Sequence, residues 1–349
     1  MKRWKVTFGL FLLLFALATT VACAETKEAK MDWNDRTVIF AQPGETIHFT
    51  YDVPEDFVVT KEEWLWYFAY TDGHGSFGSG SNDDEYGATH FESYTYEPTG
   101  IHVEWDGKGS ISLSANEMVR IQLRLNGYEY LYAYVLVADP AEYYTYEIQN
   151  GEATITGYNK DLLRRKVLIP QEIEGYPVTT IGDRAFSDMP SGIGKEFYIP
   201  DNVTTFGKEA FAGSAYLDAV RMPQKLTKMG EGVFAACLQM HFLEIPDSLT
   251  EIPDEAFVNC WGYGAGRGDY SVEQCIGKNV TKIGKSAFAG CWNMGRAWGD
   301  ARLPEKLESI GEGAFQYCYK IKSLEIPAGV TVIPDRTFQG CERLESIQI

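Results

Sequence analysis

The second half of the chain repeats one pattern of apolar and polar residues. In the segment that starts at Leu324, apolar and charged residues alternate, Pro327 ends the alternation, and further apolar residues lead to Phe338. Because side chains alternate along a strand, Leu324 and Ile326 share one face and Glu325 lies on the other. Seven phenylalanines hold the corresponding position, with a shortest spacing of 23 residues: Phe186, Phe211, Phe234, Phe257, Phe288, Phe315 and Phe338.

This repeat predicts a solenoid. A single unit cannot bury its apolar side alone, whereas stacked units form a continuous core. Five cysteines lie three residues after a repeat phenylalanine, so they are expected to form an internal ladder of small buried packing units. We predict no metal site there, because no Cys-x-x-Cys motif or Cys/His cluster is present. The five are Cys237, Cys260, Cys291, Cys318 and Cys341.

Repeat units such as residues 326–341, IPAGVTVIPDRTFQGC, resemble the BspA-type leucine-rich repeat family. The resemblance covers residues 143–349 in seven copies, and residues 146–158 resemble the hairpin that caps the first coil in that family. Members of the family are mostly bacterial or protozoal surface proteins that bind other proteins, including host matrix components. The resemblance therefore implies a non-enzymatic protein-binding or adhesion module at a bacterial surface.

Residues 30–140 have no such repeat. Segments such as 46–51 and 119–125 alternate apolar and polar residues with a period of two, and turn residues separate them. This pattern predicts an all-β sandwich, immunoglobulin-like in type, ahead of the solenoid. The predicted fold is therefore β-rich throughout. The alternative function is a carbohydrate-binding accessory surface protein that uses this sandwich.

A row of tyrosines at positions 128, 130, 132 and 134 is the most conspicuous feature of this domain. Such a row could serve as a platform on which sugars stack. The Asn126-Gly127 pair, however, predicts a two-residue hairpin turn that pairs Leu125 with Tyr128. Directly paired residues share a face, so the tyrosines would join the leucines in the core. A change of one residue in the turn would reverse this assignment.

The amino terminus has the features of an export signal. A basic start precedes an apolar run that is too short to span a bilayer, and residues 1–24 are predicted to form a signal peptide. Ala22-Cys23-Ala24 fits a peptidase site that releases a soluble protein, and residues 20–23 also resemble a lipoprotein box with Cys23 as the lipidation site. Either route predicts a secreted or cell-surface protein. The net charge of −18 argues against nucleic-acid binding.

Two repeat units carry insertions, and these supply the candidate binding site. The unit between Phe257 and Phe288 is 31 residues long, and the next unit is 27. Both insertions follow the cysteine and precede the next strand, so they should emerge side by side on one edge. Trp, Tyr and Arg are enriched at interface hot spots. The predicted partner-binding residues are Trp261, Tyr263, Arg267, Gly268, Asp269, Tyr270, Trp292, Arg296 and Trp298.

Arg267-Gly268-Asp269 also resembles the tripeptide by which matrix proteins engage integrins, so an integrin-type partner is one alternative to a general extracellular or host protein. Cys260 and Cys275 flank this insertion. Cys260 holds a ladder slot that points inward, whereas Cys275 corresponds to an outward position, so the two side chains are not expected to converge in a disulfide. A bridge between them remains the alternative.

The outward position of each strand forms a second candidate surface, where Arg302 and Glu325 are expected to pair across neighbouring coils. No phosphate loop, nucleophile elbow or zinc-protease motif occurs, so we predict neither enzymatic activity nor a cofactor. Residues 344–349 read as the first strand of a further coil, and a strand edge invites pairing with another chain. This predicts weak self-association.

Overall fold

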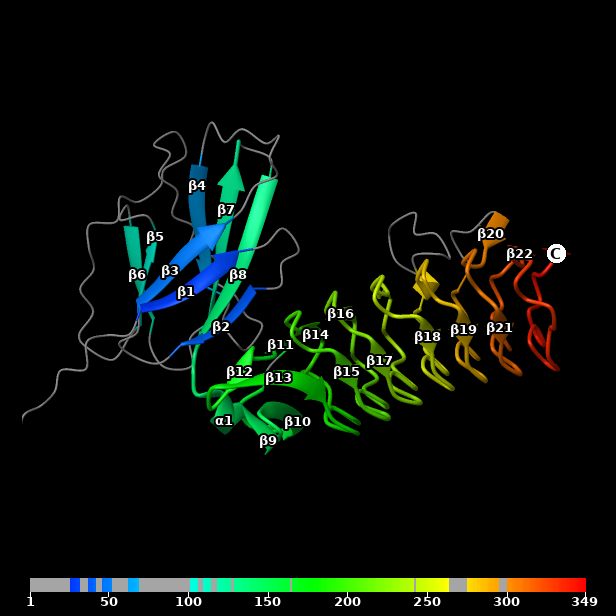
Figure 1. The fold of residues 1–349 in the computed structure, drawn as a ribbon, viewed down its shortest axis with the longest axis horizontal. Helices are drawn as coiled ribbons and strands as arrows, with labels where there is room; N and C mark the ends of the chain where they lie inside the picture. Colours follow the sequence, from blue (N-terminus) through cyan, green and yellow to red (C-terminus); the bar gives the residue numbers. More distant parts are fainter. Residues whose placement is uncertain are drawn as a thin grey trace, which may run out of the picture.

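The computed structural model describes residues 26–31, 37–41, 46–51, 62–68, 101–105, 109–113, 118–126, 129–163, 165–241, 243–263, 275–294 and 300–349. The predicted signal peptide and Cys23 lie outside these residues. Figure 1 shows two parts, a group of sheets formed by the first half of the chain and a long row of coils formed by the second.

The amino-terminal part contains two four-stranded sheets. The first has the order β1 (Thr26–Met31), β3 (Thr46–Tyr51), β5 (Ile101–Trp105) and β6 (Gly109–Leu113). The second has the order β2 (Thr37–Ala41), β8 (Glu129–Val137), β7 (Met118–Leu125) and β4 (Glu62–Phe68). The immunoglobulin-like topology is not confirmed, because the pairs β1–β3, β3–β5 and β2–β8 are parallel whereas immunoglobulin sheets are antiparallel.

The register of the β7–β8 hairpin differs from the prediction by one residue. Leu125 pairs with Glu129 rather than Tyr128, so three residues separate the strands, and Asn126 takes a positive φ of 51°. A three-residue hairpin loop accommodates such a left-handed residue. Because a shift of one residue exchanges the faces, Leu131 and Ala133 now share a face with the β7 leucines, and both are fully buried. The predicted pairing of the tyrosines with the leucines is therefore wrong.

The opposite face of β8 packs against the solenoid. The Tyr134 ring lies 4.5 Å from the ring of Tyr198, and the Tyr134 hydroxyl donates a hydrogen bond to the Tyr198 hydroxyl over 3.2 Å. The Lys166 ammonium lies 5.6 Å from the Tyr134 ring and 5.7 Å from the Tyr198 ring, within cation–π range. Tyr198 holds the position that we expected to face solvent, but it is only 4% exposed because β8 covers it.

Short strands run along the solenoid in two rows (Figure 1), and each row is divided into two hydrogen-bonded sheets. A short helix, α1 (Pro140–Tyr143), precedes them, and Asp139 caps it by accepting a hydrogen bond from the amide of Ala141. One row contains a parallel sheet of β11 (Lys166–Leu168), β14 (Glu196–Tyr198) and β16 (Ala219–Arg221), and a second parallel sheet of β20 (Asp300–Arg302), β22 (Ser323–Glu325) and β23 (Ser346–Gln348). The other row begins with a sheet of β9 (Tyr144–Gln149), β10 (Glu152–Tyr158), β13 (Tyr176–Ile181), β15 (Thr205–Phe206) and β17 (Lys228–Met229), in which β9 and β10 pair antiparallel and the rest pair in parallel. β12 (Glu172–Ile173) pairs antiparallel with β13. The row continues with a parallel sheet of β18 (Glu251–Ile252), β19 (Lys282–Ile283) and β21 (Ser309–Ile310).

The predicted phenylalanine ladder is confirmed. From Phe186 to Phe338, each ring is stacked on the next, with centroids 5.0–5.7 Å apart. The amide of each ladder phenylalanine from Phe186 to Phe315 donates to a carbonyl of the following coil, as Phe186 does to Ala210 over 2.7 Å. The rings and these hydrogen bonds together join each coil to the next along the axis.

The cysteine ladder is also confirmed, and its side chains do more than fill space. Each of the five thiols donates a hydrogen bond to the carbonyl oxygen of the phenylalanine in the preceding coil, with Sγ–O distances of 3.0–3.2 Å. Ser214 holds the same slot, and its hydroxyl donates to the Phe186 carbonyl over 2.7 Å. Burial raises the pKa of Cys260 to about 12 and that of Cys341 to about 11, so the thiols keep the proton that they donate.

Candidate functional site

Three aromatic side chains form a row on the outside of neighbouring coils. Trp261 and Trp292 are stacked with their ring centroids 4.9 Å apart and their planes 10° from parallel. Tyr319 continues the row, with its ring 5.7 Å from that of Trp292 in an edge-on arrangement. Trp261 is 42% exposed and Trp292 is 43% exposed, although most large apolar side chains of the described solenoid lie in its core. We call Trp261, Trp292 and Tyr319 the aromatic row.

The repeat itself positions this row. Each member follows a ladder cysteine directly, in the fourth position after a repeat phenylalanine. The cysteine turns inward to reach a carbonyl, so the next side chain turns outward. Asn293 ties two of these coils together, because its side-chain amide donates to the Trp261 carbonyl over 2.7 Å. The row therefore lies on a well-anchored part of each coil.

The structure brings together two of the predicted site residues, Trp261 and Trp292, as the two insertions suggested. Arg267, Gly268, Asp269, Tyr270, Arg296 and Trp298 lie outside the described residues. Tyr319 was missed by the sequence analysis, although a signal was present, since it occupies the same repeat slot as the two tryptophans. Tyr317, which is 43% exposed with its ring 6.2 Å from that of Tyr319, was missed as well.

The expectation that Tyr263 lies on the outer edge is wrong. Its side chain is fully buried, and its ring stacks on Phe257 with the centroids 4.9 Å apart. Tyr263 fills the sixth position after a repeat phenylalanine, where other coils place buried residues such as Met240 and Met294. Its hydroxyl donates to the Cys275 carbonyl over 2.6 Å and so joins the two ends of the insertion.

The outward orientation expected for Cys275 is also wrong, since this residue is 1% exposed. Its pKa is raised to about 12 by burial. Cys260 and Cys275 are both free thiols. The predicted pairing along the outward positions holds at Arg302 and Glu325, whose charged groups are 2.8 Å apart.

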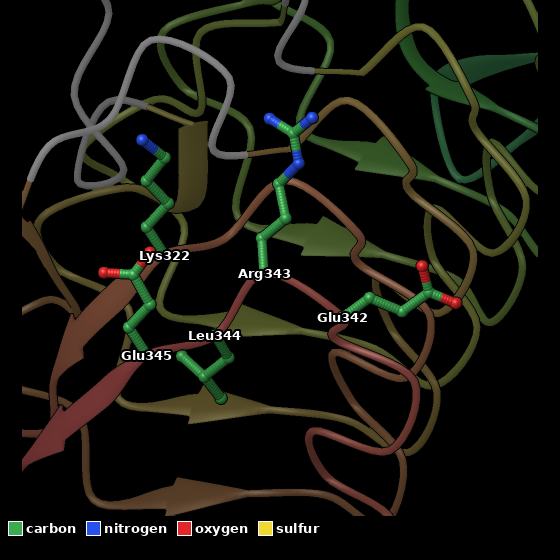
Figure 2. Close-up of a pocket in the computed structure, with 5 residues that line it drawn as sticks. All are labelled: Lys322, Glu342, Arg343, Leu344 and Glu345. Atoms are coloured by element: carbon green, nitrogen blue, oxygen red, sulfur yellow. The ribbon is translucent and has the colours of Figure 1, made fainter.

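A shallow groove of about 400 Å³ continues the aromatic row at the last coil. Glu342 occupies the slot that Trp261, Trp292 and Tyr319 hold in earlier coils. The backbone amide of Glu342 donates to the Gly340 carbonyl, just as the amide of Trp292 donates to the Gly290 carbonyl. In Figure 2 the side chains of Lys322 and Arg343 extend in the same direction, whereas those of Glu342 and Glu345 lie to either side. The groove is lined by Lys322, Glu342, Arg343, Leu344 and Glu345.

No group of three or more His, Cys, Asp or Glu side chains in the described part of the chain is placed to hold a metal ion. Over the same residues, no helix has the length and apolar character needed to cross a membrane.

Comparison with known proteins identifies the family. The family model described as "BspA type Leucine rich repeat region" matches six copies, in residues 168–263 and 271–349, which together make up about half of the chain. The chain belongs to this family. Among curated proteins, none matches it.

Several solved bacterial structures are similar to the solenoid. The leucine-rich repeat protein of T. pallidum is 24% identical over 60% of this chain and 80% of that chain, with a TM-score of 0.41. A leucine-rich repeat protein from Bacteroides ovatus ATCC 8483 is 26% identical over 59% of this chain and 52% of that chain, with a TM-score of 0.48. A leucine-rich cell surface protein from Faecalibacterium prausnitzii A2-165 is 22% identical over 58% of this chain and 86% of that chain, with a TM-score of 0.31.

Proposed function

We propose that this protein is an exported, non-enzymatic module that binds another protein at the bacterial cell surface, and that the aromatic row is the centre of its binding surface. Membership of the BspA-type family supports a binding role of this general kind. The observation that carries the proposal is the exposed stack of Trp261 on Trp292, extended by Tyr319. Aromatic side chains of this kind dominate the energetics of protein interfaces.

The stacked geometry supports a protein partner over a sugar. A pyranose ring packs on the open face of an aromatic ring, but in this stack the facing surfaces of the two indoles cover each other. The edges of the two rings carry partial positive charge, and each indole has an N–H donor. Such edges suit backbone carbonyls and apolar side chains of a protein.

The proposal also includes three expectations from the sequence. These are an immunoglobulin-like fold for residues 30–140, secretion or lipidation at Cys23, and an extracellular or host protein as the partner. Matrix proteins and integrin-type receptors are the leading classes, the latter through Arg267-Gly268-Asp269. The sugar-binding alternative for the amino-terminal domain loses support, because Tyr134 is buried against the solenoid.

A binding screen of the full chain tests the proposal. The protein, immobilised on a sensor, is exposed to purified matrix proteins and to a glycan array, in parallel with the double variant Trp261→Ala/Trp292→Ala. We expect at least one protein to bind, and the double variant to lose that binding by roughly 1,000-fold, since two hot-spot aromatics at about 2 kcal/mol each add to about 4 kcal/mol. Tyr176→Ala is the matched control, because Tyr176 is 40% exposed and lies on β13, away from the row. Unchanged binding by the double variant contradicts the proposal.

A further inference from the structure

The groove beside the aromatic row contains two cations, Lys322 and Arg343, that no carboxylate of the described residues neutralises. Within the described residues, neither Lys322 nor Arg343 has a carboxylate within 4.0 Å, although Glu342 and Glu345 line the same groove. Both side chains extend in one direction in Figure 2. The chain has 49 acidic and 31 basic residues, so carboxylates are in surplus and the lack of a partner here is not a shortage of anions.

Several other basic residues of the solenoid are paired across coils. Arg302 pairs with Glu325 at 2.8 Å, and Lys278 pairs with Asp247 at 2.6 Å. Cations that are paired in this way have little to offer a partner, whereas Lys322 and Arg343 have no such ion pair with the part of the chain that the structure describes. Arg presents a planar fork that grips a carboxylate, and Lys adds a mobile point charge.

The aromatic row and the groove that contains Lys322 and Arg343 belong to one surface. Glu342 holds the next slot of the aromatic row, and Arg343 and Lys320 hold the slot beside it in the last two coils. A chain segment that packs an apolar side chain on Trp292 and Tyr319 and continues along the solenoid axis therefore reaches Lys322 and Arg343. The segment would run along the solenoid axis because corresponding slots of successive coils lie side by side along that axis.

From this we infer, resting on the proposed function, that the partner is an acidic protein segment. It places an apolar or aromatic side chain on the aromatic row and an Asp or Glu carboxylate between Lys322 and Arg343. A short acidic segment fits better than an extended polyanion. The net charge of −18 repels a sulfated glycan or an anionic membrane over its whole length, whereas a nearby carboxylate contacts the two cations within a Debye length.

Selection from a peptide library tests this inference. A display library of short random peptides is selected against the immobilised full chain, against Lys322→Glu/Arg343→Glu, and against Trp261→Ala/Trp292→Ala. We expect peptides enriched on the parent to combine aromatic residues with Asp or Glu. The charge-reversed variant should enrich aromatic peptides without the acidic bias, and the tryptophan variant should enrich neither.

The affinity of the most enriched peptide gives the second measurement. Fluorescence anisotropy should show binding to Lys322→Glu/Arg343→Glu weakened by roughly tenfold or more, and a dependence on salt that the variant lacks. Lys225→Glu/Lys228→Glu is the matched control, since it makes the same total charge change at two exposed lysines outside the groove. Its affinity should stay close to that of the parent.

The outcomes separate the inference from the proposed function. If enriched peptides need the tryptophans but carry no acidic bias, the protein-binding role stands and the acidic partner is wrong. If the tryptophan variant enriches the same peptides as the parent, the proposed function itself fails. Tighter binding of a heparin-type sulfated oligosaccharide or of anionic vesicles at the same two cations overturns the assignment to a protein segment.

Discussion

The hydrogen bond from each ladder cysteine to a phenylalanine carbonyl leads to a test in which serine and alanine behave differently. Cys291 is fully buried in the middle of the solenoid, and its thiol donates to the Phe257 carbonyl over 3.1 Å. Cys291→Ala removes both the donor and a buried heavy atom. Cys291→Ser removes the bulk of the sulfur but keeps a donor. Ser214 shows that a serine fits this slot and reaches its carbonyl.

The cost of the alanine substitution has two parts. Loss of one buried heavy atom, comparable to a methylene, costs about 0.8 kcal/mol before any cavity term. The lost hydrogen bond adds about 0.5–1 kcal/mol, at the low end because a thiol is a weak donor. The free energy of unfolding should therefore fall by about 1.5–2 kcal/mol for Cys291→Ala. Cys291→Ser should lose less than half of that, because its hydroxyl satisfies the carbonyl.

Urea denaturation followed by circular dichroism measures both variants, and Ser214→Cys provides the reciprocal exchange in another coil. We expect the order of stability parent, then Cys291→Ser, then Cys291→Ala. If serine proves as destabilising as alanine, the Phe257 carbonyl needs no donor and the thiol acts only as packing volume.

Three further outcomes follow from the same structure. Because burial raises the pKa of Cys260 to about 12, its thiol ionises more readily in the unfolded chain than in the folded one. Its contribution to the free energy of unfolding is therefore fully present below about pH 8.5, and the free energy of unfolding falls at higher pH by about 1.4 kcal/mol per pH unit for each such thiol. Urea titrations between neutral pH and pH 11 should show this fall, and a flat profile contradicts it. Gly311→Ala should destabilise the solenoid by about 2 kcal/mol or more, because a Cβ at this position overlaps the carbonyl carbon of Gly284 in the preceding coil. A thermal melt with the same midpoint as that of the parent would contradict this, because it would show that the two coils move apart to make room. Asp269→Glu should abolish attachment to integrin-bearing cells if the tripeptide is used, and equal attachment rules that partner out.

The repeat made the solenoid core predictable, because each slot is sampled seven times within one chain. The phenylalanine ladder follows from spacing alone, and the cysteine ladder follows from its fixed offset. Cys275 and Tyr263 were misplaced because the insertion breaks that spacing. Once the strand pattern is interrupted, a tyrosine can take the core slot that a methionine fills elsewhere, and the returning chain is then fixed by the Tyr263 hydroxyl.

The errors in the amino-terminal domain have a different origin. The Asn126-Gly127 pair favours a two-residue turn, but one more residue in the turn reverses every side chain on β8. Local sequence could not decide this, because the tyrosine face has a partner that is distant in the chain. Tyr134 is buried by Tyr198, 64 positions away, and the same contact explains why Tyr198 does not face solvent.

Neighbouring slots of each coil have opposite tasks, and this separates stability from recognition. The third residue after the phenylalanine must donate to a carbonyl and fit the core, which restricts it to Cys or Ser in six successive coils. The fourth turns outward and varies freely, as Ala215, Leu238, Trp261, Tyr319 and Glu342 show. Since coils contact mainly their neighbours, a change in an outward slot leaves the ladder intact. The aromatic row therefore occupies slots whose residues the hydrogen-bonded ladder does not restrict.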